Sequence, residues 1–217
     1  MKKALALIIF SLLTIQSLSA QNNVFIENKG QWNEEILFVM KQGNQNVIVT
    51  KSGILFDKYK RDTSGNIQGN AVKLSFDNSN LNEFEAKFKA KSHYNFIIGK
   101  DQSYTNVPAF NEIVFDEIYN DVDLRLYKND RFRFDLIIKD HSSIDKVKLS
   151  FRGHKDLKIN KDNSIIITTG ISDLNIGGLR AFINGNNKES VECKFSKISS
   201  SKIGFNLDKY DKSKRLI

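Results

Sequence analysis

The sequence predicts an all-β protein, an antiparallel β-sandwich-like domain of about a dozen short strands. Three observations support this prediction. Apolar and polar residues alternate with a period of two in many short runs, turn-forming residues separate these runs, and no stretch beyond residue 20 keeps a helical apolar stripe over three turns. Such alternation is typical of strands that bury one face. At most one short helical turn is expected, at residues 142–146, where a serine precedes Asp145.

The first elements are expected to be a strand at residues 24–27 and a hairpin with strands at residues 47–50 and 54–59. The polar segment 62–70 contains two glycines and is interpreted as a flexible hairpin loop. The only proline, Pro108, favours an edge strand or a crossing between sheets, because proline cannot donate to a strand ladder. Further strands are expected at residues 72–76, 84–90, 122–126, 132–138, 147–151, 157–160, 164–168, 191–195 and 203–207.

The run at residues 84–90 shows the alternation clearly. Its apolar residues are expected to face the core, and the charged residues beside them are expected to face the solvent. The expected core face consists of Phe84, Ala86, Phe88 and Ala90, and the expected solvent face of Glu83, Glu85, Lys87, Lys89 and Lys91.

The first twenty residues have the features of a secretory signal peptide. A positive start is followed by an apolar run at residues 4–15 and by a polar, small-residue exit. The apolar run is shorter than the roughly 20 residues that span a bilayer, so no permanent membrane span is expected. We expect cleavage between Ala20 and Gln21, export through the Sec route, and a chain that is secreted or held at the outer cell surface, with the periplasm as the open alternative. Residues 21–217 then form one domain, with a sub-boundary, if there is one, near 141–144.

The positive charge of the chain comes mostly from lysine. The formal net charge is +8 over 217 residues, lysine supplies 26 of the 33 basic residues, and removal of Lys2 and Lys3 with the signal peptide lowers the charge to +6. Nucleic-acid-binding proteins rely on arginine for bidentate contacts with bases and phosphates. We therefore expect a solvated, lysine-coated surface and no nucleic-acid partner.

No catalytic or cofactor-binding motif is found. The sequence contains no G-x-S-x-G, no G-x-G-x-x-G and no P-loop. Carboxylates are numerous, and a glycosidase needs only two, but no spacing singles out a pair. Candidate carboxylates are Glu34, Glu35, Asp116, Glu117, Asp121, Asp123, Asp130 and Asp135. We expect no enzyme activity and no cofactor.

Metal and thiol chemistry have weak candidates. Asp121 and Asp123 share one strand face and suit a calcium ion, but the glycine and the distal glutamate of an EF-hand loop are missing. The three histidines show no ligand spacing, so no metal site is expected. The single Cys193 excludes an intrachain disulfide. It alternates with Val191 and Phe195, which indicates a small core residue rather than a reactive thiol.

The single tryptophan, Trp32, follows the first predicted strand. Tryptophan is suited to stacking against sugars, which keeps a carbohydrate-binding role open. An isolated tryptophan is a poor platform, however, and the structural interpretation is a staple that closes one end of the sandwich.

Several motifs in chain order resemble those of a known domain. Residues 25–32, FIENKGQW, resemble its opening F-x-E-N-K-G-Q-W, and residues 50–57, TKSGILFD, resemble its T-x-x-G-L-x-Y-D hairpin. Further matches are YNFIIG at 94–99, NVPAF at 106–110, VFDEIY at 114–119, VDL at 122–124, FDLI at 134–137, LSFRG at 149–153 and YDKSKRLI at 210–217. The similar domain is an uncharacterised all-β domain at the amino end of exported proteins with SBBP-type β-propeller repeats, often from Bacteroidetes and secreted by the type IX route.

Two departures accompany this resemblance. Asn120-Asp121 stands where the family has Pro-Gly, and the family's K-P-x-x-Y-Q stretch is replaced around residues 178–183. Relatives continue beyond the position of Ile217 into repeats and a sorting tail, so we expect either a piece of a larger protein or a free-standing module.

The resemblance implies where the protein is located and which domains accompany it, but it implies no mechanism. We expect an exported, non-enzymatic β module with a structural or interaction role, whose partners are neighbouring propeller domains, an extracellular protein or a glycan. The alternative is a carbohydrate-binding or carbohydrate-processing extracellular domain. The resemblance assigns a mainly structural part to the motif positions Asn28, Gly30, Trp32, Gly53, Asp57, Tyr94, Gly99, Pro108, Tyr119, Asp123, Asp135 and Gly153.

Overall fold

The alternating runs form seventeen β-strands and one short 3₁₀ helix within the part of the chain that the structure describes. The structure is a computed structural model that describes residues 23–139, 141–183, 189–209 and 214–217, without the side chains of 141–143. The expected signal peptide, with its cleavage site between Ala20 and Gln21, lies outside the described residues. The all-β prediction is confirmed, and the single helical turn, η1 (His141–Lys146), lies where the sequence places it.

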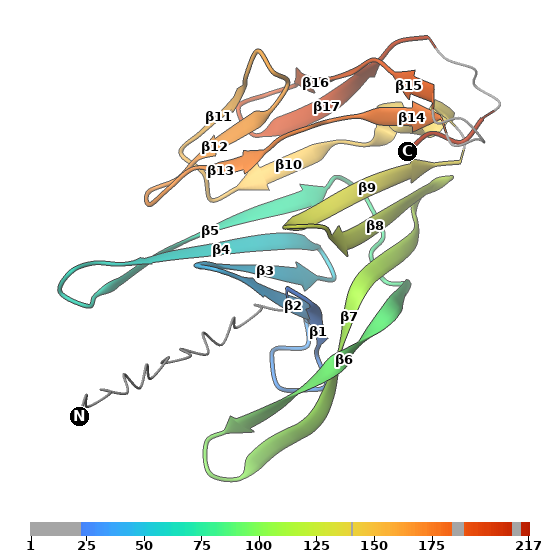
Figure 1. Ribbon diagram of the computed structural model, residues 1–217. Helices are drawn as coiled ribbons and strands as arrows, with labels where there is room; N and C mark the ends of the chain where they lie inside the picture. Colours follow the sequence, from blue (N-terminus) through green and yellow to red (C-terminus); the bar gives the residue numbers. More distant parts are fainter. Residues whose placement is uncertain (1–22, 140, 184–188, 210–213) are drawn as a thin grey trace, which may run out of the picture.

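Twelve strands form one antiparallel sheet (Figure 1). In chain order they are β1 (Phe25–Glu27), β2 (Ile36–Gln42), β3 (Gln45–Thr50), β4 (Gly53–Arg61), β5 (Ile67–Phe76), β6 (Phe84–Ile98), β7 (Gln102–Tyr119), β8 (Val122–Lys128), β9 (Phe132–Ile138), β10 (Leu149–Arg152), β16 (Cys193–Lys197) and β17 (Lys202–Leu207). Their order across the sheet is β16-β17-β10-β5-β4-β3-β2-β1-β7-β8-β9, and β6 pairs with β7 beside this path.

Two small sheets accompany the large one. The first contains β11 (Asp156–Ile159), β12 (Ile165–Thr168) and β13 (Leu174–Ile176), and the second contains β14 (Ala181–Ile183) and β15 (Glu189–Val191). Leu216 forms isolated bridges to Ile138 of β9 and to Ile183 of β14, so the final residues connect the large sheet to the β14–β15 pair.

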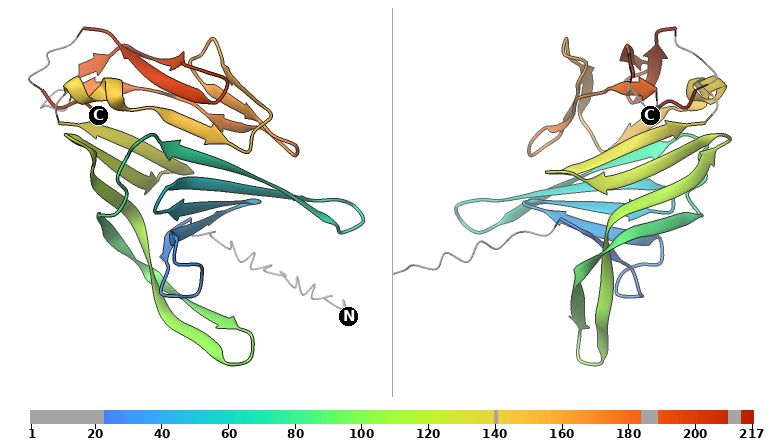
Figure 2. Two further views of the ribbon diagram at one scale, coloured as in Figure 1. Left: turned by 180° about the vertical axis from the view of Figure 1, so that it is seen from behind. Right: turned by 45° about the vertical axis from the view of Figure 1, so that its right-hand side comes forward.

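The large sheet curls, so that strands far apart in its order face each other across the core (Figure 2). Phe132 and Phe134 of β9 lie against Phe56 of β4 and Phe76 of β5, with ring centroids 5.7 and 6.0 Å apart. After η1, β10, β17 and β16 continue this curled sheet beyond β5, and the two small sheets lie in the same part of the molecule, drawn in yellow to red in Figure 1. One cluster of buried side chains connects the strands before η1 with those after it.

The predicted hairpin loop at residues 62–70 is too long. β4 and β5 remain paired up to Arg61 and Ile67, so only residues 62–66 form the turn. The Asp62 carboxylate accepts hydrogen bonds from the backbone N–H groups of Ser64 and Asn66 at 2.9 and 2.8 Å. An Asx-type turn thus closes the loop, whereas the glycine content alone suggested a flexible segment.

The predicted buried face of residues 84–90 is wrong in part. Phe84 is 38% exposed and Phe88 is 68% exposed. β6 lies beside the main path of the sheet and pairs with β7 alone, and the exposure of these rings shows that the body covers the expected face only in part. Phe88 also has a left-handed backbone, with φ of 55°, and the ladder with β7 is bulged between Lys89 and His93. These local departures end the simple alternation on which the prediction depended.

β6 and β7, of 15 and 18 residues, are longer than any strand expected from the sequence. β7 pairs with β1 at Ala109 and Phe110, and before Ala109 it pairs with β6 alone. We call residues 90–108 the arm, because this part of the hairpin projects from the body of the molecule (Figure 1).

Candidate functional site

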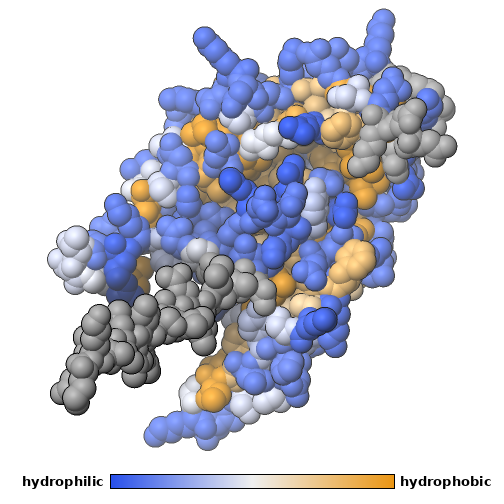
Figure 3. Space-filling view, viewed as in Figure 1, coloured by the Kyte–Doolittle hydropathy of each residue, from blue (hydrophilic) through white to orange (hydrophobic). Residues whose placement is uncertain are grey.

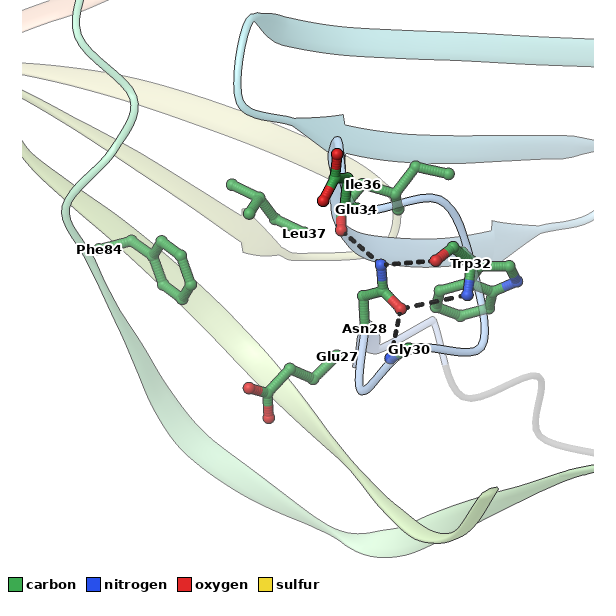
Figure 4. Close-up of a pocket in the computed structure, with 8 residues that line it drawn as sticks. All are labelled: Glu27, Asn28, Gly30, Trp32, Glu34, Ile36, Leu37 and Phe84. Atoms are coloured by element: carbon green, nitrogen blue, oxygen red, sulfur yellow. Dashed lines mark hydrogen bonds between the residues drawn. The ribbon is translucent and has the colours of Figure 1, made fainter. Parts of the chain in front are cut away.

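The loop between β1 and β2, at residues 28–35, is organised by one side chain. The Asn28 Nδ2 donates to the carbonyl oxygens of Trp32, Asn33 and Ile36 at 3.3, 2.9 and 2.8 Å. Its Oδ1 accepts hydrogen bonds from the backbone N–H groups of Gly30 and Trp32 at 3.0 and 3.2 Å (Figure 4). Both polar atoms of the carboxamide are therefore used to hold the loop backbone.

The next residues of the motif complete this loop. Gln31 is 5% exposed, and its side chain accepts from the Lys29 N–H at 2.7 Å and donates to the Glu27 carbonyl at 2.6 Å. Gly30 has a φ of 106°, and a Cβ there would lie 3.1 Å from the Tyr104 ring. The positive φ and this close approach explain the glycine.

Trp32 fastens the arm to the loop. Its ring is half-buried and lies 5.2 Å from the Phe96 ring in an edge-to-face arrangement. Both rings belong to a small second cluster that extends from the base of the arm toward its tip, formed by Val24, Ile26, Trp32, Ala90, Tyr94, Phe96, Tyr104, Val107 and Ala109. Trp32 thus acts as a staple, but it holds the arm rather than an end of the sandwich.

A depression of about 470 Å³ lies beside this loop (Figure 4). It is lined by Glu27, Asn28, Gly30, Trp32, Glu34, Ile36, Leu37 and Phe84. Most of its polar groups already have partners: the Asn28 carboxamide holds the loop, and the Glu27 carboxylate accepts from the Lys29 ammonium at 2.6 Å. The exposed Glu34 carboxylate and the Phe84 ring are the groups best placed to contact a ligand.

The other three motif glycines also have a positive φ. At Gly53 and Gly153, with φ of 136° and 89°, a Cβ would lie 2.2 Å from the Leu74 carbonyl oxygen and 2.1 Å from that of Ala71. Gly99, with φ of 65°, turns the tip of the arm and has open space around it. Gly53 and Gly153 are therefore required by close backbone approach, and Gly99 by backbone conformation alone.

Other motif residues lie in separate places of the fold. Asp57 on β4 accepts from the Asn46 side chain on β3 at 3.1 Å. Tyr94 belongs to the small second cluster. Pro108 lies in β7 opposite His93, at the bulge of β6, where β7 loses its β1 neighbour. A missing N–H is tolerated at such an interruption of the ladder.

A group of ionic side chains connects β7, β8 and β9. Arg125 lies between Glu112 at 2.6 Å and Asp135 at 3.7 Å, and its guanidinium lies 4.5 Å from the centre of the Tyr127 ring. Burial raises the pKa of Asp135 despite the hydrogen bond from Tyr127 and the charge of Arg125. Because an arginine separates the two carboxylates, this group is suited to joining strands rather than to acid–base catalysis.

The Asp123 carboxylate is engaged in a comparable way. Its Oδ1 accepts from the Glu117 backbone N–H at 2.9 Å and lies 2.8 Å from the Lys139 ammonium. Asp121 instead accepts from the Asn120 side chain at 2.6 Å. Lysine supplies the positive charge that a calcium ion would bring, and the described residues contain no group of three or more His, Cys, Asp or Glu placed to hold a metal.

Asp77 forms a hub that the sequence analysis missed. Its carboxylate accepts from the Ser150 hydroxyl on β10 and the Lys202 ammonium on β17, and its carbonyl accepts from the Tyr119 hydroxyl at 2.7 Å. Burial raises the pKa of Asp77, but hydrogen bonds from Lys202 and Ser150 and the charge of Lys148 outweigh it, so the pKa is lowered. Burial raises the pKa of Tyr119 to about 12. No local pattern signals this hub, because its members come from four strand regions.

Cys193 is half-buried and packs against the core cluster. Burial raises the pKa of its thiol, and the charge of Glu192 adds to this effect. A raised pKa disfavours the reactive thiolate, in agreement with the expected core role.

These contacts define an all-β domain whose motif residues shape turns, one loop and the base of an arm. The chain belongs to the family described as Domain of unknown function (DUF7948), which matches residues 25–217. The resemblance to an uncharacterised domain is thereby confirmed. Searches among curated proteins and among solved structures find no match. None of the helices in the described ranges is long and apolar enough to cross a membrane.

Proposed function

We propose that this chain is an exported, non-enzymatic β module with an interaction role in a secreted or cell-surface protein. The observation that carries the proposal is the arm. The described residues include seven large apolar side chains that are exposed, and four of them lie on β6: Phe84, Phe88, Ile97 and Ile98. Of these, Ile97 and Ile98 lie in the arm, near its tip, with 83% and 41% of their surface exposed, and Figure 3 shows an apolar patch on the projecting arm.

An arm that is held by aromatic packing and that exposes isoleucines near its tip is suited to contacting another protein. Large apolar side chains that remain exposed mark interaction surfaces when they gather on one element. The stapled loop and this aromatic packing reduce the conformational freedom that the arm would lose on binding. The sequence resemblance supports a neighbouring propeller domain or another extracellular protein, in a type IX-secreted protein of the Bacteroidetes kind, as the partner.

The carbohydrate alternative has one supporting observation, the depression with Phe84 and Glu34 on its rim. Sugar sites combine an aromatic platform with free hydrogen-bonding groups. Here the Trp32 ring packs against Phe96 and the Asn28 carboxamide is used by the loop, which favours a protein contact instead. A glycan array with the double variant Glu34→Gln/Phe84→Ala tests this. Saturable sugar binding that the variant loses would favour the alternative.

The role of the arm is tested with cells of the source organism from which the gene has been deleted. The purified full chain is added to these cells, and its binding to their surface is measured. We expect the double variant Ile97→Ser/Ile98→Ser to lose at least about tenfold in surface binding, with an unchanged melting temperature. The matched control is Ile198→Ser, which removes an exposed isoleucine outside the arm. Equal binding of the arm variant and the wild type would contradict the role of the arm.

Export is tested separately. Charged residues placed in the apolar run at residues 5–13 are expected to retain the protein in the cytoplasm, because the translocation machinery recognises an apolar segment. The measurement is cell fractionation with an epitope tag. Recovery of this variant outside the cell would contradict the signal-peptide assignment.

A further inference from the structure

The outer edge of β6 has no partner strand among the described residues. β6 pairs with β7 along one side, and no other strand of the large sheet joins it. Such an edge presents N–H and C=O groups that another strand can pair with. The part next to the body, Phe84 to Lys87, is in regular register with β7, because Phe84 faces Phe115 and Lys87 faces Glu112. Lys89 keeps the same register opposite Phe110, although Phe88, between Lys87 and Lys89, has a left-handed backbone, and the register shifts between Lys89 and His93.

The side chains along this edge follow a symmetric pattern. The segment Glu83-Phe84-Glu85-Ala86-Lys87-Phe88-Lys89 has acidic residues on one side of Ala86 and basic residues on the other. Its apolar residues are placed symmetrically about the same alanine. A strand with this pattern is complementary to itself when it runs antiparallel.

We propose that β6 pairs antiparallel with β6 of a second copy of this chain, around a two-fold axis at Ala86. Glu83 then faces the second copy's Lys89, and Glu85 faces its Lys87. Phe84 faces the second Phe88, and the two alanines face each other. The interface is isologous, as a two-fold axis requires, and the large sheet continues from one copy into the other. The inference goes beyond the proposed function and does not depend on the tip of the arm.

The charges favour this register over its neighbours. A two-residue shift that centres the pair on Lys87 places two lysines opposite each other. A parallel, in-register pair places every lysine opposite a lysine and every glutamate opposite a glutamate. Opposite charges across a strand pair stabilise it and like charges destabilise it, so only the register centred on Ala86 has no repulsive pair. A one-residue shift would place apolar residues opposite charged ones.

The exposure of the side chains agrees with a missing partner. Phe88 is 68% exposed and Phe84 is 38% exposed, and the dimer places these two rings opposite each other. Glu85 and Lys87 lie 2.8 Å apart within one copy, on the same face of the strand, with 64% and 36% of their side chains exposed. Both remain accessible for the cross-strand pairs. Lysine on an edge usually discourages pairing, but here each lysine finds a glutamate.

Charge-swap variants of the full chain test the proposal by analytical ultracentrifugation. We expect Lys87→Glu/Lys89→Glu and Glu83→Lys/Glu85→Lys each to raise the dimer dissociation constant at least about tenfold, because all facing charges become alike. A mixture of the two is expected to restore a one-to-one dimer. The wild-type dimer is expected to weaken as salt rises, since these charges are exposed.

Disulfide trapping tests the register without changing any charge. In a Cys193→Ser background, Ala86→Cys is expected to form an interchain disulfide in mild oxidant, because directly opposed residues have Cβ atoms within disulfide reach. Lys60→Cys, an exposed position on β4, is the control that should remain reduced. The proposal is overturned if the wild-type chain stays monomeric at ~100 µM. It is also overturned if both charge variants retain a dimer that Ala86→Cys does not trap.

Discussion

Replacement of Asn28 by alanine removes the side chain that holds the β1–β2 loop. Five hydrogen bonds are lost, three donated to the carbonyls of Trp32, Asn33 and Ile36 and two accepted from Gly30 and Trp32. A neutral hydrogen bond contributes about 0.5–1.5 kcal/mol, and water replaces some of these bonds because Asn28 is only half-buried. We expect a loss of about 2–3 kcal/mol in the free energy of unfolding.

The assay is urea unfolding followed by fluorescence. For a slope of about 2 kcal/mol/M, the expected midpoint falls by about 1 M. Trp32 is the only tryptophan, so its emission reports directly on this loop, and a red shift of the folded variant is expected as the ring loses its packing on Phe96.

Two further variants delimit the Asn28 prediction. Asn28→Asp keeps the acceptor for the two N–H groups but turns an anionic oxygen toward three carbonyls, so it is expected to be at least as destabilising at pH 7. Asn111→Ala, which removes one exposed hydrogen bond to the Phe88 carbonyl, is expected to cost less than about 1 kcal/mol. An Asn28→Ala protein within about 0.5 kcal/mol of the wild type, with unchanged emission, would refute the assigned role.

Three other predictions concern stability and reactivity. Gly153→Ala is expected to destabilise the protein by more than about 2 kcal/mol, because its Cβ would lie 2.1 Å from the Ala71 carbonyl oxygen. The control Gly43→Ala meets only backbone strain of about 1 kcal/mol. Equal urea midpoints of the two variants would contradict this prediction. Because the pKa of Asp77 is lowered in the folded state, its carboxylate adds to the free energy of unfolding at pH values above the pKa of an unfolded aspartate. This contribution is lost as the pH falls through the lower folded pKa, so the stability of Asp77→Asn should not show this loss in acid unfolding. Cys193 should react with a thiol reagent more slowly in the native protein than in urea, because it is half-buried and its pKa is raised, and equally rapid labelling of the two states would contradict its core role.

The sequence predicted several parts of the candidate site but not how they combine. The motif around Asn28 and Trp32 was recognised, and the staple interpretation of Trp32 agrees with its packing on Phe96. Neither the function of the Asn28 carboxamide nor the position of Phe96 beside Trp32 follows from spacing, because 64 residues separate the two rings along the chain. The Asp77 hub was missed for the same reason.

Long strands were also harder to predict than short ones. β7 contains Pro108, which the sequence analysis interpreted as an edge or a crossing, and β6 contains a left-handed residue and a bulge. Each of these features interrupts the alternation that marks a strand, so no strand was expected between residues 91 and 121, and β7 and most of the arm were missed. Pairing of the two strands across the interruptions keeps the hairpin continuous.

The amino-acid sequence by itself determined the all-β class, the short helical turn and the family, because alternation, turn residues and local motifs are properties of neighbouring residues. It also indicated an apolar face at residues 84–90. Only the tertiary structure decided that this face is largely uncovered, that β6 is an edge, and that the arm projects. Coverage of a face depends on which distant strands pack against it, and a period of two carries no information about that.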